Sequence, residues 1–505
     1  MPRPAAELTG ARVLLQLPTT EEQQMRRADT YQQWKRAAQR YDRRFKLDRW
    51  KRDDRSEDYD FVEIRARLEQ LRELRARKDN QALLFTLNEG IHGNLGGMGR
   101  PALYRKAKFG TKKLIVDYTE EIVAALEHLA SARVRNIDLD DKLDFFQRAS
   151  HCYGRSALLM SGAGSLLYYH LGVIKALWEQ GVLPSILSGS SGGAFIAGLV
   201  GTRSDSELDE LFDDDFLEAE AAEEGSFVRQ LFPFSRSRMS ADEIWEVIER
   251  LVPDMTFQEA YEHSKLHINI SVAPVEHHQA SRLLNAITSP NVMVREAVLA
   301  SCAVPAVYPP VTLAARNSKG RRQPYLANRK WVDGSVAQDL PLKRLSRLYG
   351  VNHSVVSQTN PLVLPFISEF KNRHTVWDIL RDTGLRTAKD WSLAAAQLIQ
   401  KPLGRELTIS RWINTYGSVI SQTYTGDINI LPASRSFNPF HLLSPRTKRE
   451  ILDLIRMGER ATWPTIEKIR TQTRISRALD GILERFEDRL VTIAQKQQIM
   501  LDRSA

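Results

Sequence analysis

The sequence predicts an α/β protein, with a mostly parallel central sheet and helical segments before and after it. Two neighbouring stretches, residues 157–181 and 182–200, each read as a short apolar strand, a glycine-containing turn and a helix. Two such units in succession favour parallel strands joined by right-handed crossovers. Residues 20–85 are long, charged and poor in helix breakers, which predicts a helical region ahead of the sheet.

The first 150 residues are predicted to be helical. Apolar residues recur at helical spacing within them, and we favour faces packed on the rest of the protein over direct membrane binding. The two sets are Tyr31, Trp34, Ala38 and Tyr41, then Leu68, Leu71 and Leu74. Residues 90–101 are rich in glycine but lack Gly-Lys-Ser/Thr, so a connecting loop is expected rather than a nucleotide-binding loop. Residues 116–150 again show helical spacing.

From about residue 151 the composition changes to that of an α/β domain. Residues 157–160 read as a buried strand, 161–165 as a turn, and 166–180 as a helix closed by a glycine. A second strand over 182–187 leads through another turn into a helix that ends near residue 200. The later elements are expected as strands at 267–272, 330–332 and 351–357 and a helix at 292–303.

Beyond about residue 370 the chain is predicted to be helical again. We expect a helix over 375–399, a second from Ser444-Pro445 (N-cap and first helical residue) to 463, and a third over 466–498. The sequence therefore divides into three regions: an N-terminal helical domain, 1–150, a catalytic α/β domain, 151–370, and a C-terminal helical extension, 371–505.

Composition narrows the class of protein. There is no signal-peptide pattern, and no stretch reaches the roughly 18 apolar residues of a spanning helix. The two cysteines, Cys152 and Cys302, lack metal spacing, which indicates a reducing, cytoplasmic location. We expect no metal and no cofactor. The net charge of +9 favours an anionic partner such as a lipid surface, and no nucleic-acid motif is present.

One strongly acidic segment stands out. Residues 205–224 hold eleven acids and no base. A solvated acidic helix is the default interpretation, and a mobile lid or a calcium loop are the alternatives.

The pentapeptide Gly189-Ser190-Ser191-Gly192-Gly193 lies between an apolar strand and an apolar helix. A serine in such a turn is held at a helix N-terminus, where backbone N–H groups can bind an oxyanion. Gly189 and Gly193 allow the tight nucleophile elbow, because a turn of this kind brings backbone segments close together. Ser191 is therefore the candidate nucleophile, and the alternative is an ordinary glycine-rich turn.

An acyl-transfer site also needs amide donors and a base. We assign the glycine-rich turn Gly162-Ala163-Gly164 to the oxyanion hole, with a further N–H from Gly192. Asp333 ends a short strand and precedes Gly334, so it is the candidate base, although Asp-Gly is also a common turn.

The histidines leave a second arrangement open. His353, His374 and His441 all follow Asp333, so a Ser-Asp-His triad in that order is an alternative to a base without histidine. His170 is expected to be a packing residue. The His277-His278 pair lacks neighbours at metal spacing.

These motifs, in this order, resemble those of the patatin-like phospholipases: a glycine-rich loop at 162–164, the Gly-x-Ser-x-Gly serine at 191, and Asp333-Gly334-Ser335. The chain is similar above all to the subgroup of triacylglycerol lipases and lysophospholipid acyltransferases that carry a helical N-terminal domain. That subgroup has an Asn-Leu-Gly-Gly segment, as at 94–97, and the resemblance covers about residues 30–370.

The resemblance implies a three-layer patatin-like domain and a Ser-Asp dyad in which Asp333 accepts the proton of Ser191. It implies hydrolysis of fatty-acyl esters of a glycerolipid, triacylglycerol or phospholipid, at a membrane or lipid-droplet surface. The basic end segments and the aromatic loop 437–440 are candidate lipid contacts. A lysophospholipid acyltransferase or transacylase, and a weakly active lipid-surface scaffold, are the alternatives. The oligomeric state is left open.

Overall fold

A computed structural model describes residues 18–231, 241–276, 279–305, 307–335, 339–360, 363–364, 425–433 and 446–504. Several sequence-based expectations fall outside these residues: His277-His278, His374, His441, the helix at 375–399, the loop 437–440, and the Ser444-Pro445 pair.

A seven-stranded, mostly parallel sheet forms the centre of the molecule, as predicted. The strand order is β4-β3-β2-β1-β8-β9, and β7 pairs with the far end of β3. All neighbouring pairs are parallel except β3 with β4 and β3 with β7. The strands are β1 (Arg155–Met160), β2 (Ile186–Gly189), β3 (His267–Pro274), β4 (Arg282–Leu284), β7 (Trp331–Asp333), β8 (Val351–Ser357) and β9 (Ile428–Ile430). A separate hairpin joins β5 (Ala314–Arg316) to β6 (Arg322–Pro324).

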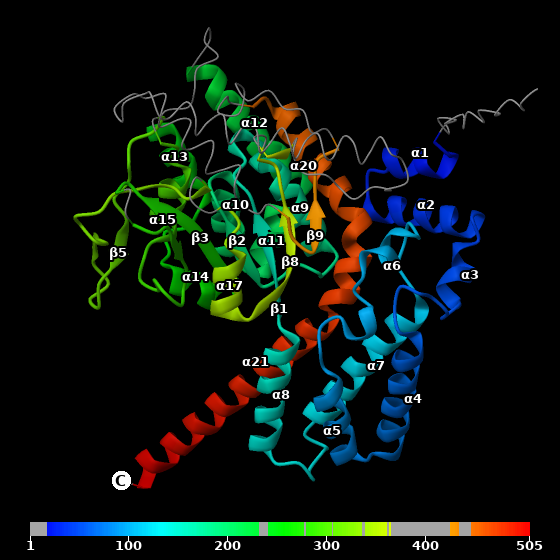
Figure 1. Cartoon of the computed structure of the whole chain (residues 1–505). Coiled ribbons are helices and arrows are strands. Elements are labelled where there is room, and N and C mark those ends of the chain that lie inside the picture. The colour runs from blue at the N-terminus through cyan, green and yellow to red at the C-terminus, as the bar shows by residue number, and fades with distance from the viewer. Residues whose placement is uncertain are drawn as a thin grey trace, which may run out of the picture.

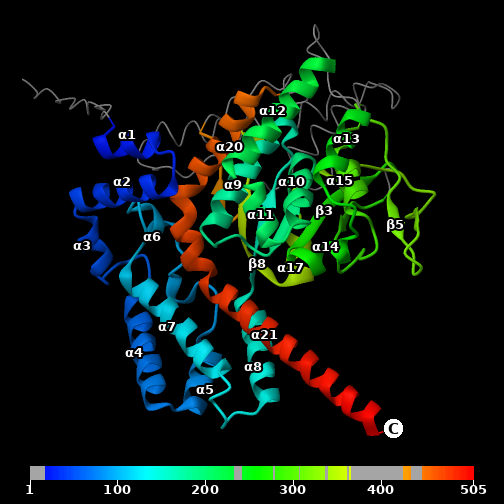
Figure 2. The same cartoon turned by 180° about the vertical axis from the view of Figure 1, so that it is seen from behind.

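Helices cover both faces of the sheet, which gives the three predicted layers (Figures 1 and 2). One face packs against α9 (Leu167–Glu179), α10 (Gly192–Gly201) and α15 (Val294–Cys302). The other face packs against α17 (Leu342–Tyr349). The central strand β1 is apolar on both sides, since its residues 157–160 are all buried. Further helices surround the first face: α11 (Asp205–Leu211), α12 (Asp214–Leu231), α13 (Ala241–Leu251), α14 (Phe257–Ser264) and α20 (Lys448–Thr462).

The N-terminal region is helical, but the stretch predicted over 20–85 is divided into five helices. Side-chain caps explain the breaks: Thr30, Asp60 and Asp79 each accept a backbone N–H at the start of the next helix. The elements are α1 (Thr20–Arg27), α2 (Tyr31–Arg44), α3 (Leu47–Arg52), α4 (Phe61–Arg77), α5 (Asn80–Gly90), η1 (Leu95–Gly97), α6 (Pro101–Arg105), α7 (Lys113–Ala130) and α8 (Leu139–Tyr153). Most of the predicted apolar faces are buried, Tyr31, Trp34, Leu68 and Leu71 among them, so they pack inside the protein.

The last helix, α21 (Ile466–Ser504), shares a core with the N-terminal helices (Figure 1). Ile475, Leu479, Ile482 and Phe486 belong to the same apolar cluster as Phe146 of α8. The two predicted helical extensions are therefore in contact, and the division into three domains stays a prediction.

The start of α20 differs from the expectation at Ser444. The helix begins at Lys448, because Thr447 is its N-cap and forms a capping box with Glu450. A short 3-10 turn, η5 (Trp463–Thr465), then leads into α21.

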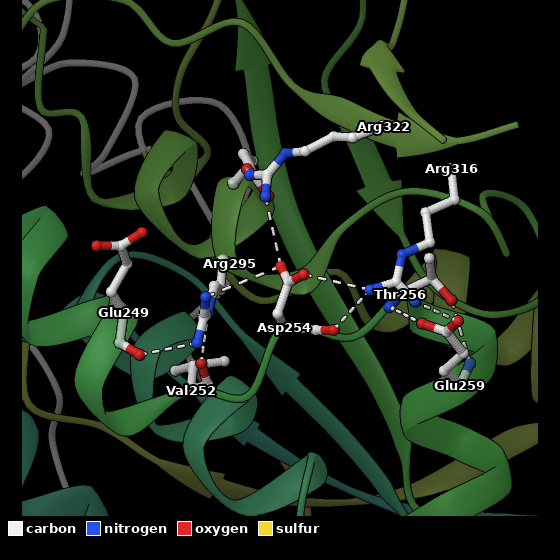
Figure 3. Close-up of polar contacts among 9 residues, drawn as sticks. Glu249, Val252, Asp254, Thr256, Glu259, Arg295, Arg316 and Arg322 are labelled. Atoms are coloured by element: carbon white, nitrogen blue, oxygen red, sulfur yellow. Dashed lines mark hydrogen bonds and ion pairs between the residues drawn. The ribbon is translucent and has the colours of Figure 1, made fainter. Parts of the chain in front are cut away.

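A group of ion pairs fixes the β5–β6 hairpin to the first face (Figure 3). The carboxylate of Asp254, between α13 and α14, lies 3.2 Å from Arg316 and 3.4 Å from Arg322, one from each strand of the hairpin. Arg295 near the start of α15 lies 3.9 Å from the same carboxylate. These contacts hold α15 in place at its amino end, and its carboxyl end reaches the candidate site.

The acidic segment 205–224 is helical, forming α11 and the first part of α12. Its apolar side chains Leu208, Leu211 and Leu217 are buried, and Asp214 pairs with Lys175 of α9 at 2.7 Å. Amphipathic helices of this kind fit the default interpretation of the segment.

Across the described ranges, no helix combines the length and the apolar character required to span a bilayer.

Candidate active site

The turn between β2 and α10 holds Ser191 in a strained backbone conformation. Its φ of 53° is combined with a ψ of −124°, a backbone conformation that is strained for a residue other than glycine. Ser191 is the N-cap of α10 and is 8% exposed. A Cβ on Gly193 would lie 2.5 Å from the Met160 carbonyl oxygen, and a Cβ on Gly189 would overlap the Gly193 carbonyl. Both glycines are therefore needed for the turn.

A serine on a neighbouring helix supports this turn. The Ser191 N–H donates to the Oγ of Ser301 at 2.9 Å, and that hydroxyl donates to the Ser271 carbonyl at 2.8 Å. Ser301 lies on α15 and is buried. No sequence pattern indicates this residue, because a serine inside an apolar helix is not distinguished by its neighbours.

The sheet brings Asp333 to the same edge as Ser191. Ile270 of β3 pairs with Gly189 of β2, and Val272, two residues further along β3, pairs with Asp333. The Asp333 carboxyl is 2% exposed, and this burial raises its pKa to about 6. Hydrogen bonds from the Ser335 backbone, the Ser335 side chain and the Ser191 side chain oppose the rise in pKa. A serine hydroxyl thus lies beside a buried carboxyl whose proton affinity is increased.

The glycine-rich turn after β1 lies against this pair. A Cβ on Gly162 would lie 3.7 Å from the Ser191 Cβ, and one on Gly192 would lie 3.0 Å from the Ala163 Cβ. The Gly162 N–H, however, donates to the Asp339 carboxylate at 2.8 Å and is therefore engaged. Among the described residues, the amides of Ala163, Gly164 and Gly192 have no acceptor. These three remain the candidate oxyanion donors.

The structure describes one of the three histidines proposed for a triad, His353, and places it far from Ser191. His353 lies at the amino end of β8, opposite Ser156, whereas Ser191 follows the carboxyl end of β2. Its ring contacts the Ser156 Oγ and the Gln472 side chain, each at 3.1 Å. A triad through His353 is therefore excluded. His353 instead lines a cavity of about 580 Å³ together with Gly93, Asn94 and Gly99. The glycine-rich 90–101 stretch therefore lies at the opposite edge of the sheet from Ser191.

His170 packs within the core as expected, but in a polar setting. Its ring nitrogens contact the Ser357 Oγ at 2.7 Å and the Ser161 carbonyl at 3.1 Å. Burial lowers the pKa of His170 to about 4, so the ring is neutral at physiological pH.

Two residues that were not selected from the sequence as site residues also contact the site. Cys302 Sγ donates to the Ser191 carbonyl at 3.5 Å, and burial followed by the nearby Asp333 raises the pKa of this thiol.

The second of these residues is Asp339, which was not among the candidate site residues chosen from the sequence. It is 1% exposed, and in the sequence it is marked only as an acid three residues before the start of α17. Burial raises the pKa of its carboxyl to about 7, while the hydrogen bonds from Gly162 and Asn360 lower it.

Two parts of the chain match known families. Residues 19–151 match a domain of unknown function, DUF3336, and residues 158–345 match the family described as patatin-like phospholipase.

Curated relatives match over most of the chain. A patatin-like phospholipase domain-containing protein of Cryptococcus neoformans is 32% identical over 90% of this chain and 54% of its own length. The triacylglycerol lipase ptl2 of Schizosaccharomyces pombe is 31% identical over 90% of this chain and 74% of its own length. The chain thus spans about half the length of the first of these relatives. The crystal structure of VipD from Legionella pneumophila covers 64% of this chain and 68% of its own, with 13% identity and a TM-score of 0.27.

Proposed function

This chain belongs to the patatin-like phospholipase family, and on that premise we propose that it is a serine lipid acyl hydrolase cleaving fatty-acyl esters of glycerolipids. The observation that carries the proposal is that the Ser191 side chain lies close enough to the buried Asp333 carboxyl to lower its pKa, at the edge of the sheet where β2 and β7 end. The amides of Ala163, Gly164 and Gly192 beside them supply the donors that an ester intermediate requires.

The proposed reaction has two halves. In the first, the Ser191 Oγ attacks the ester carbonyl carbon while Asp333 takes the hydroxyl proton, and the carbonyl oxygen becomes an oxyanion facing the free amides. The intermediate collapses, the alcohol leaves with the proton from Asp333, and an acyl-enzyme remains. In the second, water attacks the acyl-enzyme, Asp333 again takes a proton, and the fatty acid leaves as Ser191 is regenerated. A carboxyl whose pKa is near 6 accepts a proton more readily than an ordinary aspartate.

Two comparisons support a glycerolipid substrate. The family is described as phospholipases and the Schizosaccharomyces pombe relative as a triacylglycerol lipase, and both substrates are glycerol esters of fatty acids. Because such lipids reside in an interface, we propose that the protein acts at a membrane or lipid-droplet surface by peripheral contact. The cytoplasmic location stays a prediction.

The test is a lipid-release assay with the purified chain on vesicles of phosphatidylcholine and on emulsified triolein. Wild type should release fatty acid, whereas Ser191→Ala and Asp333→Asn should lose about 10³-fold or more of the rate. The matched control is Ser188→Ala on β2, the strand that leads to Ser191, which removes a buried hydroxyl with no hydrogen-bond partner among the described residues. This control should keep the wild-type rate.

Two further measurements separate the alternatives. Adding lysophosphatidylcholine should leave fatty acid as the main product, and transfer of most acyl groups to the lysolipid would instead assign a transacylase. A fluorophosphonate probe should label wild type at Ser191. Absence of labelling together with absence of fatty-acid release would favour the scaffold and overturn the proposal.

A further inference from the structure

We propose that Asp339 is a positioning residue that holds the 161–164 loop against the Ser190-Ser191 turn, and so keeps the Ala163 and Gly164 amides directed at the reacting ester. The inference rests on the function proposed above. It assigns to that site a residue outside the Ser191–Asp333 pair.

Asp339 joins three segments that are distant in sequence. Its Oδ1 accepts the Gly162 N–H at 2.8 Å, and its Oδ2 accepts from Asn360 Nδ2 at 3.4 Å. Its backbone carbonyl accepts the Ser190 hydroxyl at 3.0 Å. One buried residue thus contacts the loop that carries the candidate oxyanion donors and the turn that carries the nucleophile.

The hydrogen bond to Gly162 fixes the direction of a peptide unit. A peptide N–H and its C=O point in opposite directions, so holding the Gly162 N–H toward Asp339 sets the rotation of the 161–162 peptide, from which the chain continues into the Ala163 and Gly164 amides. The two next amides, of Ala163 and Gly164, are those without acceptors. If the 161–162 peptide rotated, we expect these two amides, which follow it in the chain, to change direction as well.

The opposite side of the loop is held by α9 and by the segment that follows β8. The Thr359 N–H donates to the Ser161 Oγ at 2.9 Å, and His170 contacts the Ser161 carbonyl. With Ser161 fixed from that side, Asp339 supplies the restraint at Gly162. Both oxygens of the Asp339 carboxyl face N–H donors, and each oxygen accepts one hydrogen bond from them.

The experiment compares Asp339→Ala and Asp339→Asn in the full chain, using the rate of Ser191 labelling by a fluorophosphonate and the kcat and KM for p-nitrophenyl butyrate. Active sites are titrated, so that a partly unfolded sample lowers the number of sites and not the kcat per site. Asp339→Ala should lower the labelling rate and kcat by about tenfold to a hundredfold with KM unchanged. Asp339→Asn should recover most of this loss, since its amide oxygen can accept the Gly162 N–H.

The matched control is Asp42→Ala. Asp42 is also fully buried and also accepts backbone N–H groups, those of Lys108 and Phe109, but it lies among the N-terminal helices. The Asp42→Ala variant should be less stable than wild type and should keep the wild-type kcat per titrated site. Equal losses of kcat in the two alanine variants would show a general structural effect and overturn the inference.

The remaining outcomes are also decisive. Unchanged labelling in Asp339→Ala, with an active wild type, overturns the inference and leaves the proposed function standing, whereas an unreactive wild type overturns the function itself. Should Asp339→Ala not fold, Ser190→Ala removes the second tether, and an unchanged labelling rate in that variant would count against the inference.

Discussion

Ser301 and Ser191 are joined by a hydrogen bond from the Ser191 N–H to the Ser301 Oγ, and this contact supports a residue whose backbone is strained. A conformation in the left-handed region costs a non-glycine residue of order 1–3 kcal/mol and persists only where its surroundings enforce it. The same hydrogen bond removes the Ser191 N–H from the set of amides that could stabilise an oxyanion. Ser301 therefore supports the geometry of the turn by accepting this N–H.

The first prediction concerns that support. Ser301→Ala leaves the Ser191 N–H buried without an acceptor, which costs about 1–3 kcal/mol and allows the turn to relax. We expect a lower unfolding free energy in urea and a fall in kcat of about tenfold. Ser476→Ala is the control, because it removes a buried hydroxyl whose one hydrogen bond among the described residues is to the Thr473 carbonyl within α21. If Ser301→Ala kept the wild-type kcat, the turn would not depend on this contact.

The second prediction concerns the pH dependence of the rate. Asp333 can accept a proton only when it is ionised, and burial raises the pKa of this carboxyl to about 6. We expect kcat/KM to fall about tenfold per pH unit below pH 6 and to level off above it. Initial rates on a soluble ester between pH 4.5 and 8 measure this limb. A limb centred near pH 4 would indicate an ordinary, solvated aspartate and contradict the burial argument.

The third prediction concerns the pH dependence of stability. The rate should rise with pH, whereas the contribution of Asp333 to stability should fall. The folded-state pKa of Asp333 lies above the unfolded value near 3.8, so the folded protein binds more protons between these values and loses stability as pH rises through them. At pH 8 the penalty is on the order of 2–3 kcal/mol, and Asp333→Asn should remove it. Thermal unfolding should show the variant to be more stable than wild type at pH 8, and less so or not at all at pH 4. A variant that is equally destabilised at both pH values would contradict this assignment.

Much of the secondary structure around the candidate site could be predicted, because the sequence patterns that indicate it are local. The alternation of apolar strand, glycine turn and apolar helix predicted β1, α9 and α10, and the Asp-Gly turn predicted the end of β7. The strand expected over 182–187 is nevertheless wrong by several residues, since β2 is Ile186–Gly189. Pro184 has no N–H for the ladder, and Val182 closes the end of α9 through the Leu177 carbonyl.

The contacts that support the site could not be predicted, because they depend on tertiary structure. Ser301 and Asp339 reach Ser191 and Gly162 across the fold, and neither belongs to a short-range pattern. The start of α20 shows a different failure. The Ser444-Pro445 pair predicted a helix start by composition, but α20 begins at Lys448, where Thr447 is the N-cap and forms a capping box with Glu450.

The fourth prediction tests the close crossing of α9 and α20. A Cβ on Gly172 of α9 would overlap the Ile455 carbonyl oxygen of α20, and a Cβ on Gly458 would overlap the Tyr169 carbonyl. Gly172→Ala should therefore separate the helices and cost about 1–3 kcal/mol in chemical unfolding. The control is Gly481→Ala in α21, where a Cβ would meet only the flexible end of Arg485 at 3.8 Å. That change should be neutral or stabilise by up to about 1 kcal/mol, and a stable Gly172→Ala would show that the helices can move apart freely.

The last prediction concerns the β5–β6 hairpin (Figure 3). Arg322 pairs with the carboxylate of Glu296, which is buried on α15 and whose Oε2 has no hydrogen-bond partner among the described residues. Removing Arg322 leaves a buried carboxylate without its cation, so Arg322→Ala should cost about 2 kcal/mol, less than for a fully buried pair because the arginine is half exposed. Arg321→Ala, next to it on the exposed side of the hairpin, forms no ion pair with the described residues and should change stability by less than about 0.5 kcal/mol. Because α15 also carries Ser301, the Arg322 variant should lose hydrolytic rate at temperatures where the Arg321 variant does not. Equal melting temperatures for the two variants would mean that the hairpin does not hold α15 in place.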